Sequence, residues 1–409
     1  MDNKLIQKYA QAIVKIGINI QKDQILVISA PIEGAEFVRL VTKYAYKAGA
    51  REVVIKWNDE LSTKLRFLHA NDEIFDEYPS YLKEFYLSYS RKGAAFLTIY
   101  ASDPDLMKDI NPSRMIRQQK VSSAAIKEFY DRQMANINSW CIVSIPTVSW
   151  AKKVFPKNND NEAIELLWEA ILKAARIYNE DPIQAWENHK DNLKKSMDFL
   201  NSHNFKKLKF KNQLGTNLEI DLPENHVWLG GSEYTPEKIE FIANMPTEEV
   251  FTAPHKLGVN GTVYSSKPLS YNGKLIVEFS ITFEKGKIVD FTAQKGFETL
   301  KDLINTDEGS HYLGEVALVP HNSPISQSNI LFYNTLFDEN ASCHLAIGRG
   351  YPTCVKNSEK MSPEEIEKAG INYSIVHEDF MFGTADLKIT GITHDEKEII
   401  IFNEGNFSY

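Results

Sequence analysis

Short apolar runs alternate with amphipathic helical segments through the first part of this chain, and this alternation constrains the fold more than any other feature. Residues 25–28 and 53–55 are runs of Ile, Leu and Val that are too short for helices. Residues 35–48 lie between them with helical periodicity and end at Gly49, a residue type that commonly terminates helices. Strand, helix and strand joined by short loops predict a right-handed βαβ unit, and therefore a parallel sheet.

The same alternation continues to about residue 200. We expect a helix over residues 4–16, strands over 94–99 and 141–145, one long helix over 115–134, and further helices between 160 and 200. The first turn, residues 29–34, lacks the GxGxxG pattern, and the chain contains no P-loop. We therefore predict an α/β layer that has a structural role and binds no nucleotide.

The second half has the alternating pattern of β-strands. Residues 205–210 and 218–222 flank a turn, and residues 275–283 and 288–293 flank a second turn at Glu284-Lys285-Gly286-Lys287. Late strands are expected over residues 386–393 and 398–402. The sequence thus predicts an N-terminal α/β domain, residues 1–200, with a mostly parallel open sheet. It predicts a β-rich α+β C-terminal domain for residues 201–409.

Composition excludes several classes of protein. The net charge of −9 and the lack of a basic stripe argue against a broad nucleic-acid surface. The three cysteines, Cys141, Cys343 and Cys354, form no CxxC motif and no even-numbered disulfide framework. No signal peptide and no apolar run of membrane-spanning length are recognised. We therefore expect a cytoplasmic protein with no membrane partner.

Two adjacent carboxylates, Glu248 and Glu249, lie between Pro246 and Pro254. Proline restricts its own backbone and that of the preceding residue, so the two carboxylates can be held in place. An acidic turn at the surface is the alternative interpretation, and the choice depends on the segments that follow.

His377 and Asp379 are separated by one residue. The preceding residues, 373–376, are compatible with an extended backbone, in which side chains two positions apart point to the same face. The imidazole and the carboxylate could then bind one ion, while Glu378 points away. A single His-x-Asp pair is common by chance, and an exposed acidic strand end is the alternative.

His344 follows Asn340 by four residues, and we expect a short helix there. Cys343 beside it could be a thiolate ligand, but a lone cysteine more commonly packs as a small apolar group. Gly348 and Gly350 allow an unusual backbone path that could direct Tyr351 into a site. A turn with a half-buried tyrosine is the alternative.

Two carboxylates from separate segments, one of them Glu315, together with His344 and the His377-x-Asp379 pair, form a set of nitrogen and oxygen ligands. Such a set suits Zn²⁺, Co²⁺ or Mn²⁺, with Mg²⁺ as a further candidate, and it lacks the thiolates of structural zinc sites. Five ligands with three acids are many for one tetrahedral zinc ion. They suit two ions roughly 3.5–4 Å apart that share one carboxylate. Such a pair acidifies a bridging water molecule and polarises a carbonyl oxygen.

Five segments in this order resemble the thermophilic metalloaminopeptidases, metallopeptidase family 29, of the aminopeptidase T and aminopeptidase S type. The segments are Pro246-Thr247-Glu248-Glu249-Val250-Phe251, Gly314-Glu315-Val316-Ala317-Leu318-Val319, Glu339-Asn340-Ala341-Ser342-Cys343-His344, Gly350-Tyr351-Pro352 and His377-Glu378-Asp379. Their order and spacing agree through the second half, and the first half resembles the N-terminal domain of that family more loosely.

The resemblance implies a ligand set, two divalent ions, an active-site tyrosine at Tyr351, and a homodimer whose active sites open into an internal cavity. The implied metal ligands are Glu249, Glu315, His344, His377 and Asp379. Glu315 is the candidate for the bridging carboxylate. Glu248 is a candidate general base, although neighbouring residues of a strand face opposite ways. Tyr351 could donate its hydroxyl hydrogen to the tetrahedral oxyanion or bind a metal ion.

The expected function is therefore that of a metal-dependent aminopeptidase that removes N-terminal residues from short peptides with a free N-terminus, through a water activated by two metal ions. Two alternatives remain open. One is a two-metal hydrolase of another amide or of a phosphoester, because fold and metal do not fix the substrate. The other is a non-enzymatic protein that stores metal or binds peptides.

Overall fold

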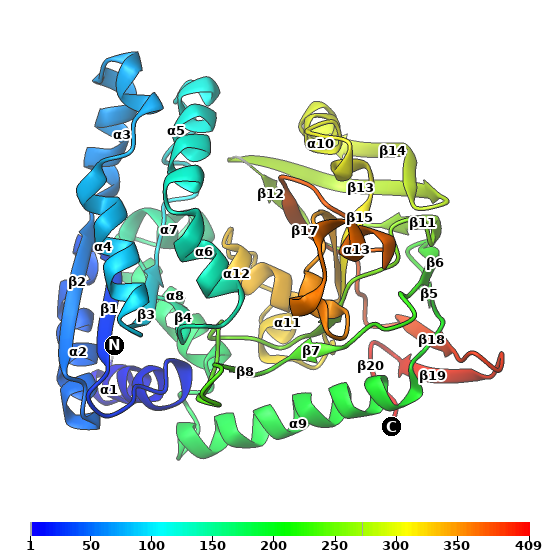
Figure 1. The fold of residues 1–409 in the computed structure, drawn as a ribbon, viewed down its shortest axis with the longest axis horizontal. Coiled ribbons are helices and arrows are strands. Elements are labelled where there is room, and N and C mark those ends of the chain that lie inside the picture. Colours follow the sequence, from blue (N-terminus) through cyan, green and yellow to red (C-terminus); the bar gives the residue numbers. More distant parts are fainter. Residues whose placement is uncertain (1, 272) are drawn as a thin grey trace. The chain divides into compact units, whose positions relative to one another are not determined.

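The computed structural model describes residues 2–271 and 273–409, and these divide into two compact units (Figure 1). Unit 1 comprises Met1–Asn188 and Ser232–Pro246, and unit 2 comprises His189–Gly231 and Thr247–Tyr409. The boundary expected at residue 200 lies within helix α9 (Pro182–His203). The assignment of residues 1–200 and 201–409 to separate domains stays a prediction.

Unit 1 contains a four-stranded sheet whose strands are all parallel, in the order β2-β1-β3-β4. The strands are β1 (Ile25–Pro31), β2 (Glu52–Asn58), β3 (Ala95–Tyr100) and β4 (Trp140–Ser144). The chain passes from β1 to β2 on one side and returns to β3 on the other side of β1, so the order reverses at β1. The parallel sheet expected from the alternating pattern is confirmed.

Helices precede, connect and follow these strands. They are α1 (Asn3–Ala12) with a π-helical turn (Ile13–Gly17), α2 (Ala35–Ala48), α3 (Glu60–His69), α4 (Ser80–Arg91), α5 (Pro112–Ala125), α6 (Lys127–Met134), α7 (Val148–Val154) and α8 (Asp160–Ala174). Helix α2 has the predicted bounds and is followed by Gly49 at a φ of 104°. The single helix expected over residues 115–134 is wrong. Ile126, at φ −111° and ψ 26°, divides it because this side chain is buried in the core beneath α4 and α6.

Unit 2 is β-rich, as predicted, and contains two large sheets. A nine-stranded sheet has the order β12-β13-β11-β6-β5-β18-β19-β20, with β14 paired to β13. Its strands are β5 (Lys207–Lys211), β6 (Asn217–Asp221), β11 (Val259–Tyr264), β12 (Leu269–Tyr271), β13 (Lys274–Glu284), β14 (Lys287–Lys295), β18 (Lys388–Ile392), β19 (Glu398–Asn403) and β20 (Asn406–Phe407). The two predicted antiparallel pairs, β5 with β6 and β13 with β14, are confirmed.

The second sheet of unit 2 has five strands in the order β17-β16-β15-β10-β7, and every neighbouring pair is antiparallel. Its strands are β7 (Leu229–Gly230), β10 (Val250–Thr252), β15 (Leu313–Leu318), β16 (His344–Gly348) and β17 (His377–Met381). One apolar core, which includes Val316, Leu345 and Phe380, packs against both sheets. The remaining helices are α10 (Phe297–Ile304), α11 (Pro324–Ser328), α12 (Thr335–Asp338) and α13 (Pro363–Lys368).

The short helix expected at His344 is wrong, because His344 is the first residue of β16. A 3₁₀ turn covers Glu339–Ala341 and ends before it. All five residues of β16 are buried, and the strand pairs with β15 on one side and β17 on the other. Pairing on both edges overrides the local preference of this segment. The extended backbone expected for His377 and Asp379 is confirmed by β17.

Among the described residues, no helix combines the length and apolar character needed to cross a membrane.

Gly348, the last residue of β16, has a φ of +105°, and a Cβ there would lie 2.2 Å from the carbonyl oxygen of Val376. We expect Gly348→Ala to lower the free energy of unfolding by at least about 2 kcal/mol, because a strained backbone and an overlap with the neighbouring segment add together. Gly93→Ala is the matched control. Gly93 has a φ of +72° but no atom within 4 Å of the added Cβ, so only the smaller backbone cost remains. Urea denaturation measures both, and equal losses would contradict the role of the close approach.

Candidate metal centre

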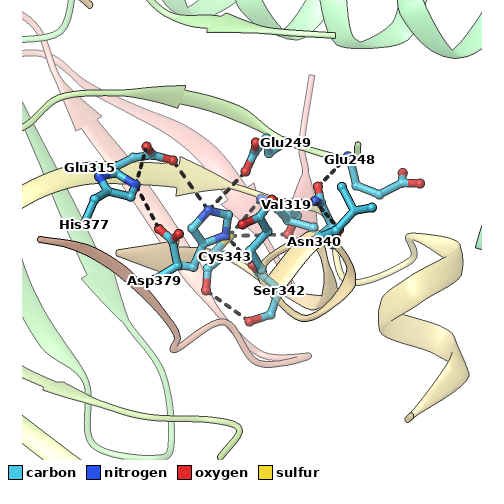
Figure 2. Close-up of polar contacts among 12 residues, drawn as sticks. Glu248, Glu249, Glu315, Val319, Asn340, Ser342, Cys343, His377 and Asp379 are labelled. Carbon is cyan, nitrogen blue, oxygen red and sulfur yellow. Dashed lines mark hydrogen bonds and ion pairs between the residues drawn. The ribbon is translucent and has the colours of Figure 1, made fainter. Parts of the chain in front are cut away.

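Five side chains of unit 2 gather into two groups that share Glu315. Glu249, Glu315 and His344 form one group, and Glu315, His377 and Asp379 form the other; within each group one candidate ligand atom per residue lies within 4.8 Å of the others. His344 Nε2 lies 3.0 Å from Glu249 Oε2 and 3.5 Å from Glu315 Oε1. His377 Nε2 lies 3.5 Å from Glu315 Oε2 and 3.6 Å from Asp379 Oδ1. The two oxygens of Glu315 therefore face two different imidazoles (Figure 2).

The register of the five-stranded sheet brings these side chains together. Glu315 on β15 pairs with Ala346 on β16, which in turn pairs with Asp379 on β17. Paired residues lie on the same face, and so do residues two positions apart, which places His344 and His377 beside them. The residue between Glu315 and Asp379 is Ala346, whose small side chain leaves space between the two carboxylates.

Burial makes the gathering of acids costly without a cation. Glu249, Glu315 and His344 are 8%, 5% and 1% exposed. Glu249 Oε2 and Asp379 Oδ1 are buried without a hydrogen bond, although histidine nitrogens lie near both. Buried carboxylate oxygens that lack hydrogen bonds are strongly unfavourable unless a positive charge compensates them. Nitrogen and oxygen donors in this arrangement fit divalent transition metals.

Both histidines are oriented with Nε2 toward the acids. The Nδ1 of His344 lies 3.2 Å from the carbonyl oxygen of Ser342, and the Nδ1 of His377 lies 2.7 Å from that of Arg349. A backbone carbonyl can only accept a hydrogen bond, so the proton of each neutral imidazole is assigned to Nδ1. Each Nε2 is then left with a lone pair, which is the arrangement that metal-binding histidines require.

Several ionisable groups of the cluster have raised pKa values in the metal-free protein, which favours their protonated forms. Burial raises the pKa of Glu315, and the neighbouring charge of Asp379 adds to this. Burial alone would lower the pKa values of His344 and His377, but the surrounding carboxylates outweigh it and raise both. A cation could replace these protons and compensate the same charges.

Glu339 is a further acid of this centre that the sequence analysis did not assign. It lines a cavity together with Asp379, and burial followed by the charges of Glu249 and Asp379 raises its pKa well above the ordinary value. In the sequence, Glu339 lies five residues before His344, and no ligand-spacing rule predicts that the two side chains share a site. The 3₁₀ turn that carries Glu339 is what returns its carboxylate to the cluster.

Tyr351 lies beside the cluster. Its ring centroid is 4.9 Å from that of His377 and 6.0 Å from that of Phe251. Burial raises its pKa well above 10, and the charge of Glu315 raises it further. The phenol therefore keeps its proton and can act as a hydrogen-bond donor.

Cys343 and Glu248 are not brought to the cluster. Burial raises the pKa of Cys343 to about 12, and its Sγ contacts Val319, so it packs as a neutral side chain. The carboxylate of Glu248 lies 3.7 Å from His189 Nε2, and Figure 2 shows it pointing away from Glu249 and Glu315. The backbone N–H of Glu248 donates to Asn340 Oδ1 at 2.7 Å.

Comparisons with known proteins identify similar chains along the whole length. The family model described as thermophilic metalloprotease (M29) matches residues 2–407. The chain is 48% identical over 406 residues to Aminopeptidase 2 of Geobacillus stearothermophilus, with 99% of this chain and 98% of that protein covered. It is 38% identical over 402 residues to Aminopeptidase T of Thermus thermophilus, with 98% of each covered. The solved structure of wild-type AmpT from Thermus thermophilus superposes with a TM-score of 0.93 at 36% identity and covers 99% of both chains.

The raised pKa values predict how stability depends on pH. Glu315, Glu339, His344 and His377 all have folded pKa values above the reference values of 4.5 and 6.5. The folded metal-free protein therefore binds more protons than the unfolded chain, and its stability should fall as pH rises from about 5 to 8, by on the order of 1 kcal/mol per pH unit. Saturating Zn²⁺ should abolish or reverse this slope, because a metal displaces the same protons.

Urea denaturation of the chelated and the zinc-loaded protein across this pH range measures both slopes. A metal-free stability that is flat or rises between pH 6 and 8 would contradict the electrostatics of the cluster.

Proposed function

The chain belongs to the thermophilic metalloprotease family M29, and from this premise we propose that it is a metal-dependent aminopeptidase that removes N-terminal residues from short peptides. The relatives are named aminopeptidases and cover the whole chain. The observation that carries the proposal is the position of Glu315, whose two oxygens each face a histidine and belong to two separate ligand groups.

The proposed ligands divide between two divalent cations. Glu249, Glu315 and His344 would hold one, and Glu315, His377 and Asp379 would hold the other, with Glu315 shared. When bound, such ions acidify a water molecule for attack and polarise the carbonyl of the scissile amide. Glu339 is our candidate for an additional ligand or for a proton acceptor. Zn²⁺, Co²⁺ and Mn²⁺ suit these donors, and Mg²⁺ is a further candidate.

Side chains around the cluster have roles that follow from their own chemistry. The phenol of Tyr351 can donate to the oxyanion that develops on the attacked carbonyl. The carbonyls of Ser342 and Arg349 hold the imidazoles in one orientation. A cavity beside Asp379 is also lined by Glu339 and Glu378, whose carboxyl oxygens can accept hydrogen bonds from the free α-ammonium group of a peptide.

Glu248 stays a candidate general base from the sequence analysis, but it would have to rotate toward the cluster to act. Its position beside His189 favours a positioning role instead. Full turnover in a Glu248→Gln variant would remove the catalytic role.

The dimer rests on the resemblance to the family, and the cytoplasmic location rests on the three cysteines, which form no disulfide framework. We propose a homodimer with an enclosed cavity, located in the cytoplasm, and neither a membrane nor a nucleic acid as partner. Light scattering of the purified protein tests the dimer, and a monomer at micromolar concentration would contradict it.

The function is tested with paired aminoacyl-arylamide substrates, one with a free and one with an acetylated amine. We expect hydrolysis of the free substrate alone, loss of activity on chelation, and recovery with about two equivalents of Zn²⁺, Co²⁺ or Mn²⁺ per chain measured by elemental analysis. Equal cleavage of the blocked substrate would favour another amide hydrolase. Peptide binding by metal-loaded protein without turnover would favour a binding protein.

Tyr351→Phe separates metal binding from catalysis. We expect an unchanged metal content and a loss in kcat of roughly 10²–10³-fold, because one donor to the oxyanion is removed while the ligands remain. Tyr373→Phe is the matched control, since Tyr373 lies on the adjoining segment but is 68% exposed. Normal turnover in Tyr351→Phe would exclude the proposed role, and a lower metal content would show that the hydroxyl acts as a ligand.

A further inference from the structure

Unit 1 contains a cavity of about 320 Å³ that has no part in the proposed hydrolysis. Its floor is formed by the four-stranded parallel sheet, and its walls come from α4 and α6. The strand order reverses at β1, where β2 and β3 lie on opposite sides. In open parallel sheets, ligands bind near the C-terminal ends of the strands at such a reversal. The volume is within the range of small-molecule sites.

A polar row crosses the floor of this cavity. Lys56 on β2 pairs with Ser29 on β1, which pairs with Thr98 on β3, so the three side chains lie side by side on one face. All three are half-buried, whereas Ile28 and Leu97 on the opposite face are fully buried. The polar row therefore borders open space, which a purely structural layer would fill with apolar side chains.

The side chain of Asn58 connects two members of this row. Lys56 Nζ donates to Asn58 Oδ1, and Asn58 Nδ2 donates to Ser29 Oγ at 2.9 Å. An ammonium group has three N–H donors, and this contact uses one of them. The ammonium is thus oriented by a neutral amide, which leaves its charge uncompensated at the cavity.

The cavity carries a positive charge and no negative one. None of the described residues that line it is Asp or Glu, and Lys56 is its only Lys or Arg side chain. The Lys56 side chain is half-buried, so its ammonium is partly removed from water, and this burial lowers the pKa of Lys56. A partly desolvated cation without an acidic partner is stabilised by a bound anion.

The walls above the polar row are aromatic. Tyr86 of α4, Phe129 and Tyr130 of α6, and Trp140 of β4 line the cavity. Phe129 packs edge-on against Phe96 of the floor, with ring centroids 5.0 Å apart. Such walls bind flat or branched apolar groups, for which an inorganic anion offers nothing. A nucleotide would require the glycine-rich phosphate loop that this chain lacks.

We infer that this cavity binds a small organic carboxylate with an aromatic or branched aliphatic body, with the carboxylate on Lys56, Ser29 and Thr98 and the body between the aromatic walls. A free apolar amino acid and the C-terminal end of a short peptide both have this chemistry. Recognition does not require the ligand's amine, because no acidic side chain among the described lining residues faces it.

The test uses the full chain after chelation, so that binding at the metal centre does not contribute. 3-Phenylpropionate is the probe, and phenethylamine is the matched compound with an amine in place of the carboxylate. We expect calorimetry to show one 3-phenylpropionate per chain and no binding of phenethylamine. Because Trp140 lines the cavity, we also expect 3-phenylpropionate to change the tryptophan fluorescence of the protein, and this change should disappear in Trp140→Phe. Phenylalanine and the dipeptide Gly-Phe distinguish a free amino acid from the C-terminal end of a peptide as the ligand. Binding of either compound more tightly than 3-phenylpropionate supports the inference.

Lys56→Gln should weaken 3-phenylpropionate binding by about tenfold or more, because it removes a hydrogen bond to a charged group. Lys43→Gln, at an exposed position of α2, is the control and should bind normally. Thr98→Val keeps the shape of the floor and should also weaken binding. This second variant tests the inference if Lys56→Gln is unstable in thermal melting.

The inference would be overturned if the Lys56 and Lys43 variants bound 3-phenylpropionate with equal affinity. It would also be overturned if inorganic phosphate bound equally well, or if binding appeared only with metal present. The outcome of this binding test does not depend on whether the protein hydrolyses the aminoacyl-arylamide substrates.

Discussion

The structure of unit 2 depends on the compensation of carboxylates that are gathered in a buried place. Glu249, Glu315 and Asp379 approach two imidazoles on one face of a sheet, and two of the acidic oxygens have no hydrogen bond. Protein alone stabilises such a group poorly, since each charge loses hydration and repels its neighbours. Protons compensate it in the metal-free chain, and divalent cations compensate it better because they bring more charge per site. The charge that makes the cluster costly therefore favours a bound divalent cation.

The sheet solves the geometric part of this problem through its register. The candidate ligands on β15, β16 and β17 occupy one face because the side-chain period of a strand is two residues. Ala346 lies between Glu315 and Asp379, and Gly348 lies opposite His377. Larger residues at these two positions would occupy space that ions could fill. The candidate centre therefore depends on the small residues of β16 as well as on the candidate ligands.

Helical periodicity and strand alternation in the sequence correctly predicted those elements whose structure depends on neighbouring residues in the chain. The bounds of α2 follow from periodicity and from Gly49, and the placement of His377 and Asp379 on one face follows from strand alternation. Five nitrogen and oxygen donors were grouped as candidate ligands from the sequence, the family resemblance assigned them residue by residue, and the structure brings these side chains close together. Three features depended on contacts distant in sequence. Pairing on both edges makes His344 a strand residue, burial of Ile126 divides a helix, and a 3₁₀ turn returns Glu339 to the cluster. No pattern within those segments contains that information.

The two units treat partly buried charge in opposite ways, and the contrast bears on how each functions. Unit 2 concentrates acids whose compensation requires a cation of high charge. Unit 1 places a single ammonium group, held by the neutral side chain of Asn58, at the floor of an aromatic cavity. A partly desolvated charge that is retained without an internal partner is most simply explained by a partner that the chain does not supply. The composition of the cavity then defines that partner as an anion with an apolar body.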